Sequence, residues 1–179
     1  MSHRLKTLLA VTCDVLLVGS VVGLVWGEKG NHEDAGNTPA PHLRARQGAT
    51  VSLECGLLAS ERVGTPLSAA FELEGGKRYL VVSTIQRETF LEVIVDDTTG
   101  QITTVRALTS SEEITAATAH RAVMRKATKS LRTAAETALT AYPGFRALRV
   151  VPVLKDEQPV AEMTLVKDGT VTTVREPLE

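Results

Sequence analysis

The stretch Gly100-Gln-Ile-Thr-Thr-Val-Arg106 returns near the end of the chain as Gly169-Thr-Val-Thr-Thr-Val-Arg175. Each copy starts with a glycine suited to a turn and continues with the alternating β-branched residues of a half-buried strand. Upstream, Glu92-Val-Ile-Val95 aligns with Glu162-Met-Thr-Leu165 when a gap of one residue is allowed. Because Thr-Val alternation is common in strands, these matches indicate, without proving, that a strand block occurs twice.

Helices are predicted before each group of strands. Ser52 can cap a short helix, and a Gly-Thr-Pro sequence ends it. Ser110 and Glu113 fit a capping box, in which each side chain satisfies the backbone N–H of the other residue. From there to Tyr142-Pro143-Gly144 the chain has no glycine or proline. We therefore expect either one long helix or two helices with a break near Ser130.

The strands are expected to form antiparallel meanders joined by short turns. They are predicted at residues 69–74, 78–86, 89–96, 101–105, 147–154, 160–166 and 170–175. The order of helix and meander thus occurs twice, which predicts an α+β fold with one unit at residues 49–108 and a second, including the long helical region, at residues 109–179. A unit of this size buries little surface alone, so we expect the two to share an interior.

The N-terminal segment is typical of a signal peptide or a signal anchor. Arg4 and Lys6 precede an apolar run at residues 8–26, interrupted by Asp14. Its eleven leucine and valine residues contribute about −4 to −5 kcal/mol to insertion, against a cost of about 3 kcal/mol for the aspartate. The interpretation is therefore a leader at residues 1–27, either retained or cleaved. Residues 28–48 are predicted to be a flexible linker.

Composition excludes several classes of protein. A net charge of −1 provides no general attraction to nucleic acid. Aromatic residues make up only 3% of the chain, so the core should be aliphatic. The two cysteines, Cys13 and Cys55, cannot form a disulfide framework or a structural zinc site. Cys55 is expected to be a small buried hydrophobic residue.

Parts of the sequence resemble the PepSY domain family. Ser130-Leu-Arg-Thr-Ala-Ala-Glu-Thr-Ala-Leu-Thr-Ala-Tyr-Pro-Gly144 is similar to the family's helix, which often begins Ser-Leu-Glu and ends near Pro-Gly. Val95-Asp-Asp-Thr-Thr-Gly-Gln-Ile102 is similar to its closing turn, Val-Asp-x-x-Thr-Gly-x-Val. Ser52-Leu-Glu54 begins a second helix of this kind, with Gly56 where alanine is usual, and the second turn is reduced to Lys167-Asp-Gly169. The matches span residues 51–175.

The resemblance implies a domain outside the cytoplasm, often tethered to a membrane, that binds or restrains other proteins, including peptidases in some members. It implies no catalytic residue, cofactor or metal. The residues agree, because the chain lacks a Gly-x-Ser-x-Gly sequence, a phosphate-binding glycine loop and a His-Glu-x-x-His sequence. His32 and His42 could hold a metal ion, but ordering the linker would oppose binding. Asp96 and Asp97 are expected to serve the turn.

One local charge pattern suggests a binding surface. Arg121, Arg125, Lys129 and Arg132 recur at helical spacing, and Lys126 lies beside them. As a functional stripe they would receive an acidic protein partner or anionic lipid. As a structural feature they are a solvated face near a helix C-terminus, which base rates favour.

Together, these observations predict a non-catalytic binding or regulatory module outside the cytoplasm, periplasmic or at the cell surface. It would contact the membrane through its N-terminal segment and restrain a peptidase or sense envelope conditions. The alternatives are an accessory subunit of a membrane complex and, as the less favoured reading, an enzyme that uses surface carboxylates.

Overall fold

The computed structural model describes residues 51–179, which form an α+β fold. The predictions for residues 1–27 and 28–48, and for Cys13, His32 and His42, lie outside the described residues. The elements in chain order are α2 (Leu53–Ser60), β1 (Thr65–Glu74), β2 (Lys77–Gln86), β3 (Thr89–Val95), β4 (Ile102–Ala107), α3 (Ser111–Met124), α4 (Leu131–Ala141), β5 (Arg146–Lys155), β6 (Gln158–Lys167) and β7 (Thr170–Pro177). Each predicted strand is present, and the expected break near Ser130 is confirmed, because Ser130 caps α4.

Local sequence determines where the three helices begin. The hydroxyls of Ser52, Ser110 and Ser130 accept hydrogen bonds from backbone N–H groups three residues later, at 3.3, 3.2 and 3.1 Å. The Ser110 hydroxyl also donates to the Glu113 carboxylate at 2.8 Å. Each cap satisfies an N–H group that the first helical turn leaves without a partner.

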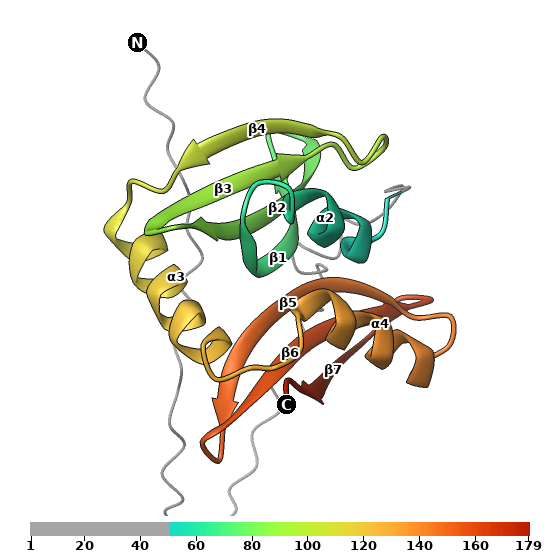
Figure 1. The fold of residues 1–179 in the computed structure, drawn as a ribbon. Coiled ribbons are helices and arrows are strands. Elements are labelled where there is room, and N and C mark those ends of the chain that lie inside the picture. Colours follow the sequence, from blue (N-terminus) through green and yellow to red (C-terminus); the bar gives the residue numbers. More distant parts are fainter. Residues whose placement is uncertain (1–50) are drawn as a thin grey trace, which may run out of the picture. The chain divides into compact units, whose positions relative to one another are not determined.

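All seven strands join in one antiparallel sheet, in the order β4-β3-β2-β1-β5-β6-β7 (Figure 1). Two meanders, β1 to β4 and β5 to β7, therefore meet edge to edge where β1 pairs with β5. The described pairing at this seam joins Ala69 to Val150 and Ala70 to Arg149. The seam makes one continuous sheet out of strands that are far apart in the sequence.

The two halves of the sheet correspond position by position. Arg146, the first residue of β5, lies 81 residues after Thr65, the first residue of β1, and the same offset relates β2 to β6 and the start of β3 to that of β7. The bulges correspond too, since Leu67 and Leu148 are skipped by the pairing and both are buried. The seam pair of Ala69 and Val150 has the same offset, as a two-fold axis between the strands requires.

This correspondence differs from the alignment that the sequence suggests. The stretch from Gly100 to Arg106 covers most of β4, whereas its match covers most of β7, and β7 corresponds in the structure to β3. The sequence likeness between the two stretches has another physical reason. Strands β4 and β7 are the two edge strands of the sheet. Each binds its inner neighbour through a cross-strand ion pair, Arg106 with Glu92 at 2.6 Å and Arg175 with Glu162 at 2.7 Å.

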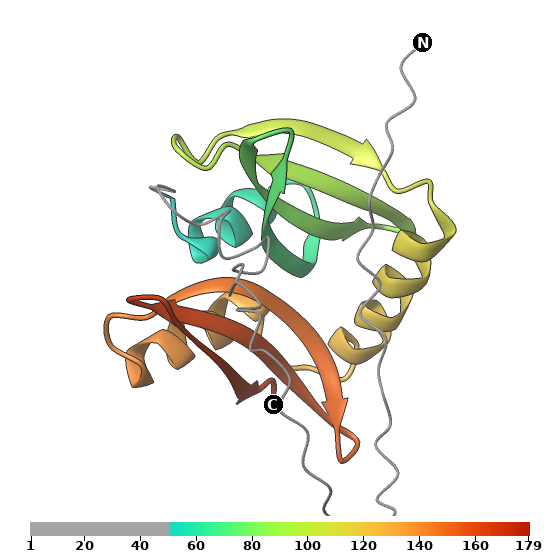
Figure 2. The ribbon, with the colours of Figure 1, turned by 180° about the vertical axis from the view of Figure 1, so that it is seen from behind.

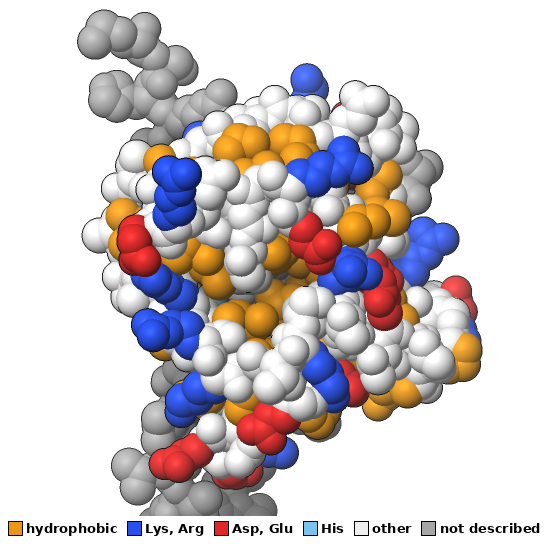
Figure 3. Space-filling view, viewed as in Figure 1, with side chains coloured by type: hydrophobic (Ala, Val, Ile, Leu, Met, Phe, Trp, Pro, Cys, Tyr) orange, Lys and Arg blue, Asp and Glu red, His pale blue; other side chains and the backbone are white. Residues whose placement is uncertain are grey.

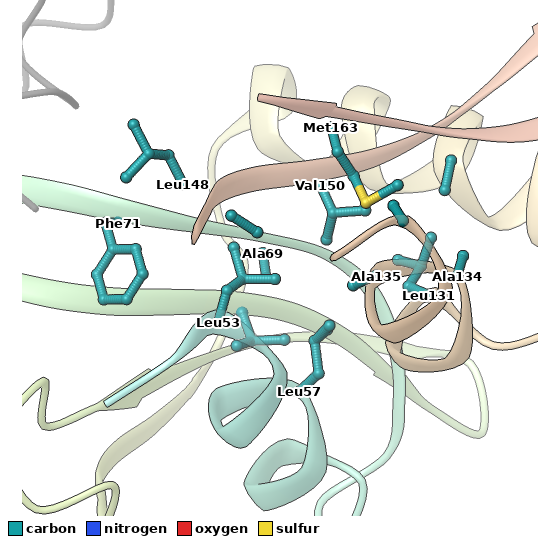
Figure 4. Close-up of a cluster of buried hydrophobic side chains, with 14 of the residues drawn as sticks. Leu53, Leu57, Ala69, Phe71, Leu131, Ala134, Ala135, Leu148, Val150 and Met163 are labelled. Atoms are coloured by element: carbon teal, nitrogen blue, oxygen red, sulfur yellow. The ribbon is translucent and has the colours of Figure 1, made fainter. Parts of the chain in front are cut away.

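The core lies between one face of the sheet and the helices α2 and α4, which also contact each other. Figure 4 shows side chains from both helices directed at those of the strands. The labelled residues are Leu53, Leu57, Ala69, Phe71, Leu131, Ala134, Ala135, Leu148, Val150 and Met163. Small alanines on α4 permit this close packing, which gives both halves one shared aliphatic core.

The expectation that Cys55 is buried is wrong, because its side chain is exposed. It lies between Glu54 and Gly56 in the first turns of α2, where Leu53 and Leu57 occupy the inward positions. On a helix of this pitch, residue 55 points away from a face defined by residues 53 and 57. Helical geometry therefore overrides the usual preference of cysteine for the interior.

Helix α3 spans the seam at the opposite end from α2 and α4 (Figures 1 and 2). It packs against β1, β2 and β5, and its buried residues Ala117 and Val123 are not members of the main core cluster. Its His120 lies close enough to Arg149 to be affected by that charge. Arg149 alternates with the core residue Val150, so it points to the second face of the sheet. We conclude that α3 covers part of this second face.

Candidate functional site

The structure distributes the four residues of the predicted basic stripe over two helices and a connection. Arg121 lies in the last turn of α3, and Arg125 is its C-cap residue. Lys129 lies in the connection, where its backbone N–H donates to the Leu178 carbonyl at 2.9 Å. Arg132 follows in the first turn of α4. The four therefore do not form one helical face, because the break before α4 interrupts the spacing from which the stripe was predicted.

Arg121 is neutralised within the fold. Its guanidinium donates two hydrogen bonds to the carboxylate of Glu88, both at 2.8 Å, and so connects α3 to the turn between β2 and β3. The hydrogen bond and charge of Arg121, with a further contribution from the charge of Arg125, lower the pKa of Glu88 below its usual value. Glu88 is exposed, so the pair adds little to stability and serves mainly to orient α3.

Arg132 is neutralised as well. Its guanidinium donates to Glu61, just after α2, and to Glu136 one turn later in α4, both at 2.9 Å. The hydrogen bonds from these two carboxylates raise the pKa of Arg132 above its usual value. The pair with Glu61 links the end of α2 to the start of α4. Arg121 and Arg132 thus have structural partners, which sequence spacing could not show.

The remaining cations form what we term the basic loop cluster, which consists of Arg125, Lys126 and Lys129. All three are exposed, and within residues 51–179 none takes part in a salt bridge. Arg125 and Lys126 stand at the carboxyl end of α3, where positive charge is favourable beside unpaired carbonyl groups. Lys129 lies beyond the helix, so this effect does not explain it. The cluster is the part of the predicted stripe that is available to a partner.

An apolar hollow lies near the centre of the face shown in Figure 3, between α3 on one side and α2 and α4 on the other. Lys and Arg side chains gather along the α3 side of this face. Partly buried hydrophobic residues at helix ends pack against the main core, among them Val63 after α2 and Met124 and Ala127 around the end of α3. Cations beside exposed apolar atoms are a combination suited to contact with another macromolecule.

A polar cavity of about 440 Å³ lies elsewhere, where the β1–β2 and β3–β4 turns come together. It is lined by Gly76, Lys77, Arg78, Tyr79, Asp96, Asp97 and Thr103. Arg78 donates to Asp97 at 2.8 Å across its wall. Arg78 was not predicted as a site residue. The hairpin of β2 and β3 was predicted, however, and extending its register from the pair of Leu80 and Val95 places Arg78 opposite Asp97.

Asp96, the first of the two acidic residues at this cavity, has the structural role in the turn that the sequence predicts. Asp96 accepts hydrogen bonds from the backbone N–H groups of Thr98 and Thr99, at 3.0 and 2.7 Å. Its pKa lies below the usual value, chiefly because of the bond from the Thr99 backbone. Gly100 completes the turn with a φ of 73°. Asp97 instead accepts a hydrogen bond from Arg78, so the two neighbouring carboxylates have different partners.

His120 is expected to make the stability of the protein depend on pH. It is largely buried on α3, with Nδ1 unpartnered within the described residues. Burial, and secondarily the charge of Arg149, lowers its pKa in the folded state below 6.5. As the pH falls through 6.5, the unfolded chain takes up a proton that the folded chain resists, so we expect stability to be lost until the folded pKa is passed. Urea unfolding at pH 7.5, 6.5 and 5 should show a smaller loss for His120→Gln, and an equal loss in both proteins would contradict this assignment.

Two further properties of residues 51–179 bear on function. They contain no group of three or more His, Cys, Asp or Glu side chains placed to hold a metal ion. None of their helices is long and apolar enough to cross a membrane.

Comparison with known proteins yields little. No family model matches the chain, and no curated protein matches it. One solved structure that does match is a "putative lipoprotein" from Clostridium difficile 630, with 13% sequence identity and a TM-score of 0.37. The match covers 74% of this chain and 97% of the other. A likeness at this level assigns neither a family nor a function.

Proposed function

We propose that this protein is a non-catalytic binding module that acts outside the cytoplasm and regulates another protein. In this proposal the described residues form two PepSY-like units, each consisting of a helix and a meander, and the N-terminal segment holds them at the membrane. The restrained partner is a peptidase or a component of an envelope-sensing system. The proposal combines the resemblance of the sequence with the surface that the fold leaves available.

The arrangement of elements supports two related units. The series α2-β1-β2-β3 and α4-β5-β6-β7 have strands of nearly equal length, two-residue turns and a bulge at the same position. The turn that resembles the PepSY closing turn is built from Asp96 and Gly100, the two residues that carry the family's pattern. Among residues 51–179, strand β4 has no counterpart in the second half, and Asp168 and Gly169 correspond in position to Arg87 and Glu88 of the β2–β3 turn instead of to the closing turn.

The observation that carries the proposed function is the basic loop cluster. Within the described chain its three cations lack salt bridges, while Arg121 and Arg132 on either side are paired. A fold that neutralises the outer members of a charge pattern and leaves the inner ones free presents those charges to an external anion. The partly buried hydrophobic residues Met124 and Ala127, which neighbour the cluster in sequence, favour an acidic protein surface that also offers hydrophobic side chains.

Replacing Arg125, Lys126 and Lys129 together with glutamine should weaken partner binding about tenfold, since three exposed ion pairs at about 0.5 kcal/mol each give this factor. The full-length proteins would be captured from detergent-solubilised membranes of cells that produce them, and the stoichiometric partner would be quantified by mass spectrometry. A matched control replaces Arg62, Lys77 and Arg146, which are exposed on other elements, and should retain the partner. Equal capture by both variants, or the absence of any stoichiometric partner, would contradict the proposal.

The location can be tested separately. Alkaline phosphatase fused after Gly48 should be active, because it requires the oxidising environment outside the cytoplasm to form its disulfides. An inactive phosphatase, together with an active cytoplasmic reporter fused at the same position, would show that the described residues remain inside the cell.

A further inference from the structure

Strand β7 ends the described sheet with one edge open, whereas its counterpart β3 has both edges paired. The outer edge of β3 is occupied by β4, in a register that runs from Leu91 opposite Ala107 to Val95 opposite Ile102. Among residues 51–179, no strand lies at the outer edge of β7. The fold therefore contains one filled and one open copy of the same edge.

The open edge presents the same backbone groups as the filled one. On β3, the Phe90 carbonyl accepts from the Leu108 N–H at 3.0 Å and the Ile94 carbonyl accepts from the Thr103 hydroxyl, so the even-numbered residues of β3 face β4. On β7, the Leu178 N–H donates to the Pro159 carbonyl at 2.9 Å, so even-numbered residues face β6. Since backbone groups alternate along a strand, the odd-numbered residues of β7 face outward.

These outward residues are Val171, Thr173 and Arg175, which correspond at the offset of 81 residues to Phe90, Glu92 and Ile94 of β3. Val171 is 41% exposed, and Arg175 is held in its ion pair with Glu162. Unpaired N–H and C=O groups along such an edge can pair with an added strand. Proline appears only at position 177, at the end of β7, so it does not block the three outward residues.

We propose that the open edge of β7 binds an extended segment of a partner protein as an additional antiparallel strand. The internal counterpart indicates the chemistry of this segment. Strand β4 has six residues, of which the five after Ile102 are exposed, so its place in the sheet depends mainly on backbone pairing. The partner segment is accordingly a short run of β-branched, mostly uncharged residues, recognised through its backbone more than through its side chains.

This inference adds a second contact surface to the proposed function and does not depend on the basic loop cluster. The two can therefore fail independently. Equal partner capture by the glutamine variant and its control would contradict the cluster and leave strand addition untouched, and a failure of strand addition leaves the cluster untouched.

The first test uses a synthetic peptide of residues 100–108 as the probe and the full-length, isotope-labelled protein in detergent. Binding should shift the amide resonances of Val171, Thr173 and Arg175. In the register of β4, the amides of Thr104 and Arg106 face the neighbouring strand and those of Thr103 and Val105 face away. A peptide N-methylated at Thr104 and Arg106 should bind at least tenfold more weakly than the unmodified peptide. A peptide N-methylated at Thr103 and Val105 should bind like the unmodified peptide.

The second test changes the protein. Thr173→Pro removes an outward N–H without removing a bond to β6, and proline is tolerated at such edge positions. This variant should lose the peptide, whereas Val105→Pro at the other edge of the sheet should keep it. Thermal unfolding of both variants verifies that they fold. If either variant does not fold, the comparison of the two methylated peptides tests strand addition instead.

Three results would overturn the proposal: no shifts at millimolar peptide, equal binding of both methylated peptides, or shifts confined to β4. Self-association of the wild-type chain that Thr173→Pro abolishes would assign the edge to a second copy instead of a partner segment.

Discussion

Replacing Leu57 with alanine should lower the free energy of unfolding by about 3 kcal/mol, within the range of about 2–5 kcal/mol typical of buried leucines. Leu57 is fully buried on α2 and belongs to the core cluster that also contains Leu131 of α4 and Met163 of β6 (Figure 4). Truncation would leave a cavity at the place where the two halves share their interior. Because both halves depend on this core, we expect one cooperative urea transition shifted as a whole.

The adjacent residue provides the control. Leu58 has the same side chain on the same helix but is 51% exposed, so Leu58→Ala should cost less than about 1 kcal/mol. If the two variants lost equal stability, or if Leu57→Ala split the transition so that only the first half unfolded earlier, the shared core would be contradicted.

Replacing Gly56 with alanine should also destabilise the protein, by about 2 kcal/mol, although alanine is the better helix former by about 1 kcal/mol. A Cβ atom at position 56 would overlap Cδ2 of Leu80, which is fully buried on β2. The packing of α2 onto the sheet therefore excludes even a methyl group here. This contact explains why glycine stands at position 56.

A double-mutant cycle isolates this contact. Leu80→Ala alone should cost about 3 kcal/mol as a cavity, but in the Gly56→Ala background it removes the clash as well. The cost of the double variant should therefore fall short of the sum of the single costs by at least about 1 kcal/mol. Additive costs in urea unfolding would show that residues 56 and 80 do not meet as described.

Much of the fold follows from local sequence. Alternating β-branched residues predicted the strands, and Ser52, Ser110 and Ser130 marked the helix starts because a hydroxyl before a helix satisfies an exposed N–H group. Gly100 marked a turn that requires a positive φ. Such features depend on a few neighbouring residues, so one sequence suffices to identify them.

The correspondence of the two halves could not be predicted in the same way. Counterparts such as Ala69 and Val150, or Leu80 and Ala161, share only a buried position, since their sizes are adjusted to different neighbours. The residues that do look alike, in β4 and β7, do so because both strands lie at an exposed edge. The sequence similarity between β4 and β7 therefore reflects their shared exposure at the edges of the sheet. It does not reflect equivalent positions in the two halves.

The candidate surface was predicted in part. Spacing identified the basic residues, but pairing with Glu88 and Glu61, 33 and 71 positions away from their arginine partners, depends on tertiary structure. The open edge of β7 has no signature in a single sequence, because it is defined by a strand that is absent from the second half among residues 51–179. The sequence therefore identified the basic residues, and the fold determined which of them remain available to a partner.

The central feature of the fold is the seam at which β1 and β5 join two meanders into one sheet. Nuclear Overhauser spectroscopy of the full-length protein tests it directly, through the protons of the seam pair Ala69 and Val150. We predict cross-strand contacts between these two residues, with neighbouring contacts between Ala70 and Arg149. Strands β1 and β5 that each show contacts within their own meander but none to each other would contradict the account.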